Sequence, residues 1–268
     1  MFKKILCAFF CVTLLLSVPV FADEPSTAVP GEQTLLSITL PYSKPLAFET
    51  SAEFETDAEV PYWIYLPICD SEKTPEGYPL IIFLHGSEER GKNDVALKAG
   101  LPRRIMREKE TWPFITVTPV CPVKRRWIEL DLRPLVEHLI AEYPVDPDRV
   151  YLTGLSMGGF GTWDALLKGP DLYAAAAPIC GGCEAHWAPQ LLDIPIWAFH
   201  GEEDPTVRPA WSIDICRAIK EQGGEKVRLS LFPDAEHDVW TPAYKDPEFY
   251  NWLLSNRLSD RMPSQKEE

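Results

Sequence analysis

Apolar and polar residues alternate along the chain with two different periods. Short runs rich in β-branched and aromatic residues have the length and pattern of strands. Longer stretches repeat apolar residues every three or four positions, as one face of a helix does. The pattern predicts strands over residues 35–40, 60–66, 79–84, 114–118, 150–153, 174–179, 194–199 and 227–232, and helices over 93–109, 130–142, 210–221 and 247–258, with another beginning after Ser156.

Strands and helices alternate, which is typical of right-handed βαβ units and of a mostly parallel sheet. Residues 79–84 read P-L-I-I-F-L, the continuous apolar run of a central strand buried on both faces. A chain of 268 residues can bury one sizeable core. We therefore expect one α/β domain over residues 34–258, with reactive groups on loops at the carboxyl ends of the strands.

One such loop carries a candidate nucleophile. The strand at 150–153 runs into G-L-S-M-G (154–158), and a glycine-rich helix start follows. A serine on so sharp a strand-to-helix turn adopts strained backbone angles, and glycines two residues away on either side let the two arms pass closely. The turn lifts the Ser156 hydroxyl clear of the sheet, beside the unpaired N–H groups at the helix start, where an oxyanion would be stabilised.

Two further loops at strand ends carry an acid and a base. Asp204 follows the strand at 194–199, and His237 follows the last predicted strand. The chain order Ser, Asp, His is that of one large class of serine hydrolases. We predict Ser156 as nucleophile, His237 as base and Asp204 as the acid that orients it. Asp204 is favoured by the tight turn with Pro205, and the acids that compete with it are Glu202, Glu203 and Asp193.

The other histidines are less suitable as the base. His138 lies on a predicted helix, and His186 lies in a loop before the wrong strand. His85 and His200 each precede a glycine at a strand end, where we expect a turn-stabilising role. Of the five histidines, His237 alone lies past the last strand.

Composition excludes some partners. Apolar residues make up 46% of the chain and charged residues 25%, as in ordinary globular proteins. The net charge of −14 argues against nucleic acid and against basic patches for anionic membranes. The predicted chemistry calls for no metal and no organic cofactor.

The first 22 residues have the features of a cleavable signal peptide. Lys3 and Lys4 precede an apolar run over 5–18, and the segment ends in a small residue, Ala22. An uncleaved membrane anchor is the alternative. We expect a secreted or periplasmic protein with no membrane attachment once residues 1–22 are removed, a flexible linker over 23–33 and a polar tail over 259–268.

Export changes the interpretation of the cysteines, because disulfides form outside the cytoplasm. Cys180 and Cys183 form a C-x-x-C, but no second pair or suitable histidine couple supports a zinc site, and the pair follows an alanine-rich strand instead of starting a helix. We expect buried structural cysteines, and the pairing stays open among Cys69, Cys121, Cys180, Cys183 and Cys216.

Four separated motifs, F-L-H-G-S-E-E-R-G (83–91), G-L-S-M-G-G (154–159), A-P-I-C-G-G (177–182) and H-G-E-E-D-P-T-V (200–207), resemble the α/β-hydrolase superfamily. The resemblance is closest to its dienelactone-hydrolase-like, phospholipase/carboxylesterase-like branch, which includes polyhydroxybutyrate-depolymerase-like esterases and "predicted peptidases". It implies an α/β-hydrolase fold with a mostly parallel sheet flanked by helices.

The resemblance also implies roles for individual residues. Ser156, Asp204 and His237 would form the catalytic triad, and the N–H groups of Met157 and Ser87 would form the oxyanion hole. Relatives usually carry glycine where this chain has Glu88 and Cys183.

The implied reaction is hydrolysis of a carboxylic ester through an acyl-enzyme. The short loop between the strands at 174–179 and 194–199 leaves no room for a large lid domain, and an open site suits bulky or polymeric esters such as acylated polysaccharides. Trp127, Trp187 and Trp240 fall near predicted rim loops, where they would stack on a sugar or phenolic group. The alternatives are a serine peptidase of the same fold and a catalytically idle binding module.

Overall fold

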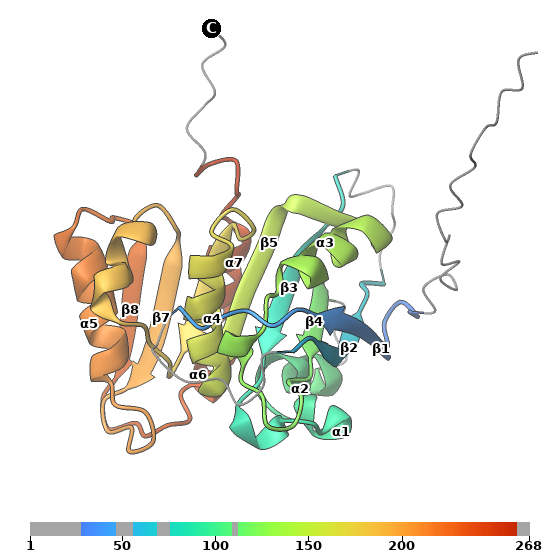
Figure 1. The fold of residues 1–268 in the computed structure, drawn as a ribbon, viewed down its shortest axis with the longest axis horizontal. Coiled ribbons are helices and arrows are strands. Elements are labelled where there is room, and N and C mark those ends of the chain that lie inside the picture. The colour runs from blue at the N-terminus through green and yellow to red at the C-terminus, as the bar shows by residue number, and fades with distance from the viewer. Residues whose placement is uncertain (1–27, 47–55, 69–75, 109–111, 262–268) are drawn as a thin grey trace, which may run out of the picture.

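The computed structural model describes residues 28–46, 56–68, 76–108 and 112–261. Their strands form an eight-stranded sheet in the order β1-β2-β4-β3-β5-β6-β7-β8 (Figure 1). β2 pairs antiparallel with both β1 and β4, and the pairs from β4 through β3 to β8 are parallel. The strands are β1 (Gln33–Leu40), β2 (Ala58–Tyr65), β3 (Tyr78–Leu84), β4 (Ile115–Pro119), β5 (Val145–Leu155), β6 (Ala175–Ile179), β7 (Ile196–Gly201) and β8 (Val227–Phe232).

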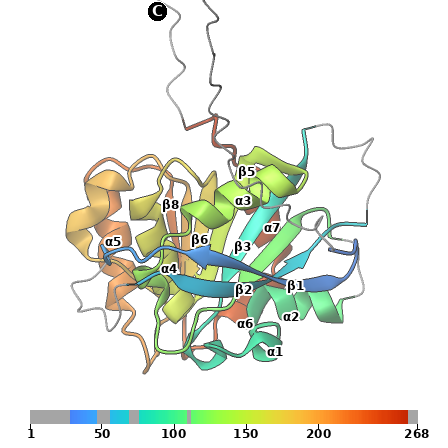
Figure 2. The same ribbon diagram turned by 45° about the vertical axis from the view of Figure 1, so that its right-hand side comes forward.

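Helices cover both faces of the sheet, as Figures 1 and 2 show. Each face has its own apolar core, and the two cores together bury the central strands on both sides. One face carries α3 (Arg133–Glu142), α4 (Met157–Lys168) and α5 (Ala210–Glu221), and the other carries α2 (Gly100–Arg107), α6 (Trp240–Lys245) and α7 (Pro247–Leu254). The shorter elements are η2 (Ser87–Glu89), α1 (Asn93–Ala96), η3 (Trp127–Glu129) and η4 (Ala185–Gln190).

The predicted sheet is confirmed, with differences at element ends. All seven residues of β3 are buried, as its continuous apolar run predicts. β5 begins at Val145, earlier than the predicted strand at 150–153, because the irregular register beside Tyr78 and Leu80 lets the pairing continue. Between β6 and β7 the chain forms only the short η4, so no lid domain enters there.

The helix predicted at 93–109 is divided, the one predicted at 247–258 is shortened, and α6 was not predicted. The helix expected over 93–109 is α1 followed by α2, because Gly100 adopts a φ of 55°, a left-handed angle that interrupts a right-handed helix. The helix expected over 247–258 ends at Leu254, and the separate α6 precedes it. Asp246 caps α7 by accepting the Glu248 N–H, so a new helix begins there.

The chain ends are described only in part. The predicted signal peptide at 1–22 lies outside the described residues, as does most of the polar tail. Within the expected linker, Gly31 donates its N–H to the Leu66 carbonyl at 2.8 Å, which holds this stretch against the end of β2. Among the described residues, none of the helices has the length and apolar content needed to cross a bilayer.

Candidate active site

Ser156 lies on the sharp turn between β5 and α4, at the carboxyl edge of the sheet. Its φ of 54° is unusual for a residue with a side chain and indicates a strained turn. A Cβ on Gly154 would collide with the Gly158 carbonyl, and a Cβ on Gly158 would collide with the Leu84 carbonyl. Both glycines are therefore required sterically, as the sequence predicts.

Three side chains from separate loops meet at this turn, and we call them the triad. His237, from the loop after β8, places Nε2 2.9 Å from the Ser156 Oγ. Its Nδ1 lies 2.6 Å from Oδ2 of Asp204, which comes from the loop between β7 and α5. With Nδ1–H donating to the carboxylate, Nε2 is free to accept the serine proton.

The Asp204 carboxylate is fully buried and well supplied with donors. Oδ1 accepts the N–H groups of Thr206 at 2.8 Å and Val207 at 2.9 Å. Burial alone would raise the pKa of Asp204, but the hydrogen bonds from His237 and from these N–H groups outweigh it and lower the pKa below its ordinary value. Asp204 is therefore ionised at neutral pH, where it can accept the hydrogen bond from His237. The competing acids Glu202, Glu203 and Asp193 are exposed.

His200 lies directly behind the triad, which sequence reasoning missed. Its Nε2 donates to the Val207 carbonyl at 2.9 Å and lies 3.2 Å from Asp204 Oδ2, while Nδ1 lies 2.7 Å from the Ser212 hydroxyl. Burial lowers its pKa, so the ring is neutral near pH 7. The residue thus supports the carboxylate as well as the turn. Asp204 is only four residues from His200, but Ser212 lies on α5, so no local pattern could show that the three side chains meet.

The two expected oxyanion donors both lie beside Ser156. Met157 is the first residue of α4, where backbone N–H groups have no partner inside the helix. Ser87 begins η2, and the preceding Gly86 is so close to the nucleophile that a Cβ there would lie 3.8 Å from the Ser156 Cβ. Both loops therefore lie next to the Ser156 side chain.

His85 determines the orientation of the Gly86–Ser87 peptide. Its Nε2 accepts the Cys121 N–H at 3.0 Å, so the proton lies on Nδ1, which donates to the Gly86 carbonyl at 2.7 Å. Because C=O and N–H point opposite ways in a trans peptide, the Ser87 N–H is directed away from the imidazole. The ring is fully buried, and this burial lowers the pKa of His85 to about 4.

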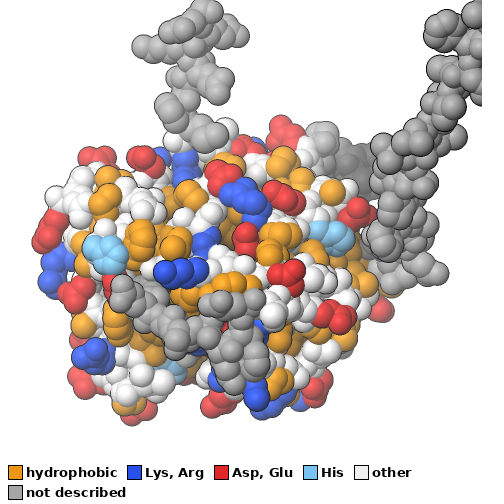
Figure 3. All heavy atoms as spheres, in the orientation of Figure 1, with side chains coloured by type: hydrophobic (Ala, Val, Ile, Leu, Met, Phe, Trp, Pro, Cys, Tyr) orange, Lys and Arg blue, Asp and Glu red, His pale blue; other side chains and the backbone are white. Residues whose placement is uncertain are grey.

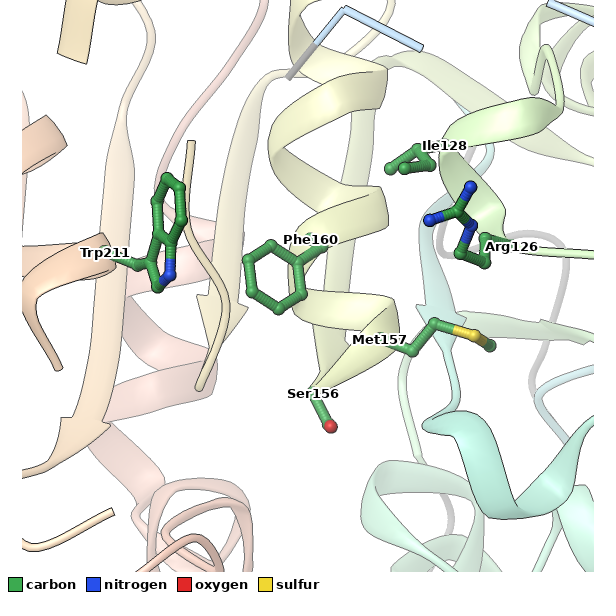
Figure 4. A pocket seen from close by; sticks show the side chains of 6 residues that line it. All are labelled: Arg126, Ile128, Ser156, Met157, Phe160 and Trp211. Atoms are coloured by element: carbon green, nitrogen blue, oxygen red, sulfur yellow. The ribbon is translucent and has the colours of Figure 1, made fainter. Parts of the chain in front are cut away.

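A cavity of about 380 Å³ opens beside Ser156 and is mostly apolar. Figure 4 shows Met157 and Phe160 on α4 next to the serine, Trp211 of α5 on one side, and Arg126 and Ile128 of the η3 segment on the other. Sequence reasoning did not single out Phe160 and Trp211. Phe160 follows Ser156 by one helical turn, and Trp211 lies in the helix that follows the Asp204 loop. Their positions in the sequence could therefore have indicated that both side chains lie near the nucleophile.

The three tryptophans predicted at the rim have different positions. The prediction for Trp127 is wrong, because the side chain is 2% exposed and its indole donates to the His85 carbonyl at 2.9 Å. Trp187 is half-buried against the apolar core and the His186 ring. Trp240 is half-buried and meets the His237 ring edge-on, with 5.3 Å between centroids. Of the three, only Trp240 contacts the triad.

Cys180 completes a group with Asp204 and His237 whose donor atoms lie within 4.8 Å of one another, as metal ligands would. Those atoms already serve other partners. The thiol donates to the His237 carbonyl at 3.1 Å, and burial raises its pKa to about 12, which disfavours the thiolate a metal requires. The free, buried cysteines among the described residues are Cys121, Cys180, Cys183 and Cys216, and Cys69 lies outside those residues.

Comparison with known proteins follows this geometry. A model of the dienelactone hydrolase family matches residues 122–248. The solved structure of a thermostable esterase superposes with a TM-score of 0.64 at 30% identity, covering 83% of this chain and 63% of that one. Poly(3-hydroxyalkanoate) depolymerase C of Paucimonas lemoignei is 45% identical over 53 residues, and a bifunctional acetylxylan esterase/xylanase of Neocallimastix patriciarum is 37% identical over 71 residues.

These two matches are partial: they cover 20% and 26% of this chain and only 13% and 10% of the relatives. The family match spans the segment that holds Ser156, Asp204 and His237, and the esterase structure superposes over most of this chain. The chain therefore has the α/β-hydrolase fold, and its residues 122–248 match the dienelactone hydrolase family.

Proposed function

We propose that the protein is a serine hydrolase that cleaves carboxylic esters. The observation that carries this proposal is the continuous hydrogen-bonded relay from Asp204 through His237 to Ser156, which ends at the mouth of an apolar cavity. A plain turn serine would not need a strained backbone, a buried carboxylate and an oriented imidazole together.

The reaction divides into two steps. His237 Nε2 takes the Ser156 proton as Oγ attacks the acyl carbonyl, and the resulting imidazolium protonates the departing alcohol. Water, activated by the same imidazole, then attacks the acyl-enzyme and releases the acid. Asp204 holds the ring in the required tautomer and stabilises its positive charge.

The oxyanion that forms in each step would receive hydrogen bonds from the N–H groups of Met157 and Ser87. Loss of one such donor typically costs about 2.7–4 kcal/mol of transition-state stabilisation. The contact between His85 and the Gly86 carbonyl supports the second donor by limiting rotation of the peptide.

The cavity and the similarity to an acetylxylan esterase favour acyl groups on polysaccharides. Met157, Phe160, Ile128 and Trp211 offer apolar surface to an acyl or sugar face. Between β6 and β7 the chain forms only the short η4, which suits access by a polymer chain on that side. We further propose export, on the basis of the basic start and apolar run of residues 1–22. N-terminal sequencing of extracytoplasmic protein should begin at Asp23, and intact Met1 in that fraction would contradict cleavage.

The test of the reaction is Ser156→Ala. We expect it to abolish hydrolysis of p-nitrophenyl acetate and labelling by a fluorophosphonate, while circular dichroism and thermal unfolding stay close to wild type. Ser255→Ala, which changes an exposed serine after α7, is the matched control and should keep both activities. Wild-type turnover by the Ser156→Ala variant would show that the G-L-S-M-G stretch is an ordinary turn and that Ser156 is not the nucleophile.

A further inference from the structure

A second, smaller cavity of about 180 Å³ lies between α2 and α6. It differs from the cavity at Ser156 in being lined by basic side chains. They are Arg103, Arg104 and Arg107 of α2 and Lys245 of α6, and the carboxylate that shares the lining is Glu108. Trp240 and Thr241 complete the wall from α6. We call this hollow the basic cavity.

The basic cavity adjoins the triad. Trp240 lines it and also meets the His237 ring edge-on at 5.3 Å between centroids. Gly100, another lining residue, is so close to the strand end that a Cβ on it would lie 3.2 Å from the side chain of Leu155, the neighbour of Ser156. The two cavities therefore flank the reaction centre from opposite faces of the sheet, since α4 and α5 cover one face and α2 and α6 the other.

Some of this positive charge is already used. Arg104 pairs with Glu108 at 2.7 Å, donates to the Tyr244 carbonyl, and lies over the rings of Trp112 and Tyr250 at 4.9 and 5.2 Å. It therefore belongs to the framework of the domain, and it neutralises the carboxylate in the lining.

The remaining cations have no such partner among the described residues. Arg103, Arg107 and Lys245 are exposed, and within the described parts of the chain none of them has an ion-pair partner. Arg103 and Arg107 are four residues apart on one helix, a spacing at which like charges repel each other. In a chain with a net charge of −14, and with acidic side chains spread over the face seen in Figure 3, such a group stands out.

We propose that the basic cavity binds the carboxylate of a uronate sugar in an acylated acidic polysaccharide, whose ester then lies at Ser156. This inference rests on the proposed esterase function. Arginine guanidinium groups match a carboxylate with two parallel N–H donors, and Lys245 adds a point charge. The half-buried Trp240 ring provides a face for the sugar itself. The overall negative charge would repel such a polymer elsewhere, so a local cationic site is needed to hold it.

The experiment compares two versions of one substrate. Acetylated glucuronoxylan oligomers are assayed for acetate release beside the same oligomers with their uronate carboxyl groups chemically reduced to alcohols. We expect the acidic version to have a KM about tenfold lower, with kcat nearly equal, and the difference to shrink in 0.5 M NaCl because salt screens exposed charges.

Charge-neutralising variants localise the effect. Arg103→Gln, Arg107→Gln and Lys245→Gln should each raise KM for the acidic oligomer about three- to fivefold, since exposed ion pairs are individually weak, and leave KM for the reduced oligomer unchanged. Lys98→Gln is the matched control, because Lys98 is a nearby exposed lysine that pairs with Asp94 and does not line the basic cavity.

The outcomes separate the two proposals. Equal KM values for the two oligomers, or equal effects of Lys98→Gln and Arg103→Gln, would overturn the carboxylate site while p-nitrophenyl acetate hydrolysis still supported the esterase. If wild type hydrolyses no ester, calorimetric titration of the protein with unacetylated oligogalacturonate still decides the site. Binding that weakens about three- to fivefold in Arg103→Gln but not in Lys98→Gln supports it, and no binding to wild type refutes it.

Discussion

Acid should weaken the fold through His85 before it protonates most carboxylates. The ring is fully buried with its pKa lowered from 6.5 to about 4, and desolvation is the main cause. The unfolded chain takes up a proton near the ordinary value, whereas the folded chain resists protonation until about pH 4. The contribution of His85 to stability is therefore constant above its ordinary pKa of 6.5, and it is lost as the pH falls from that value to about 4.

The size of the loss follows from proton linkage. Each pKa unit of difference between the folded and unfolded states corresponds to about 1.4 kcal/mol of unfolding free energy. Protonation of His85 therefore lowers the free energy of unfolding by about 3 kcal/mol across the whole window, and by about 2 kcal/mol by pH 5. His200 contributes in the same direction, because burial lowers its pKa too. The carboxylates with lowered pKa, such as Asp204, contribute only at more acidic pH.

The assay is urea unfolding at pH 7, 6 and 5 for wild type and His85→Gln. Glutamine does not titrate, so the variant should be less stable at pH 7 but lose about 2 kcal/mol less than wild type between pH 7 and pH 5. His186→Gln, which removes an exposed histidine, is the control and should keep the steep wild-type curve. Parallel curves for wild type and His85→Gln would refute the assignment of the acid sensitivity to His85.

Three further changes test the site. His200→Gln should lower kcat about tenfold with little change in KM, because the variant loses a contact that holds Asp204 in place. Steady-state and pre-steady-state kinetics measure this, and an effect on KM alone would contradict it. Trp211→Ala should raise KM for bulky aryl esters several-fold and leave that for acetate esters unchanged, and equal effects on both would argue against its role in the cavity. Cys180→Ser should retain turnover, because a hydroxyl can also donate to the His237 carbonyl, and inactivity of a folded variant would show that the thiol itself takes part.

Local pattern was sufficient for the sheet and for the serine turn. Burial on both faces forces a continuous apolar run such as that of β3, and the close passage at Ser156 requires glycines at 154 and 158. The apolar run of β3 and the approach of Gly154 to Gly158 each lie within a few residues, so the local sequence shows them, although Gly158 also packs against Leu84 of β3. The break between α1 and α2 was not predicted, because a glycine inside a helical pattern does not by itself indicate a left-handed φ such as that of Gly100.

Tertiary structure alone decided which side chains from separate elements meet. Trp127 looked like a rim residue, yet its burial depends on how η3 packs against Gly161 of α4. The contact of His200 with Ser212 of α5 and the convergence of α2 and α6 on one basic cavity join residues of separate elements. Such contacts arise from the packing of whole elements, and no periodicity within one element records them.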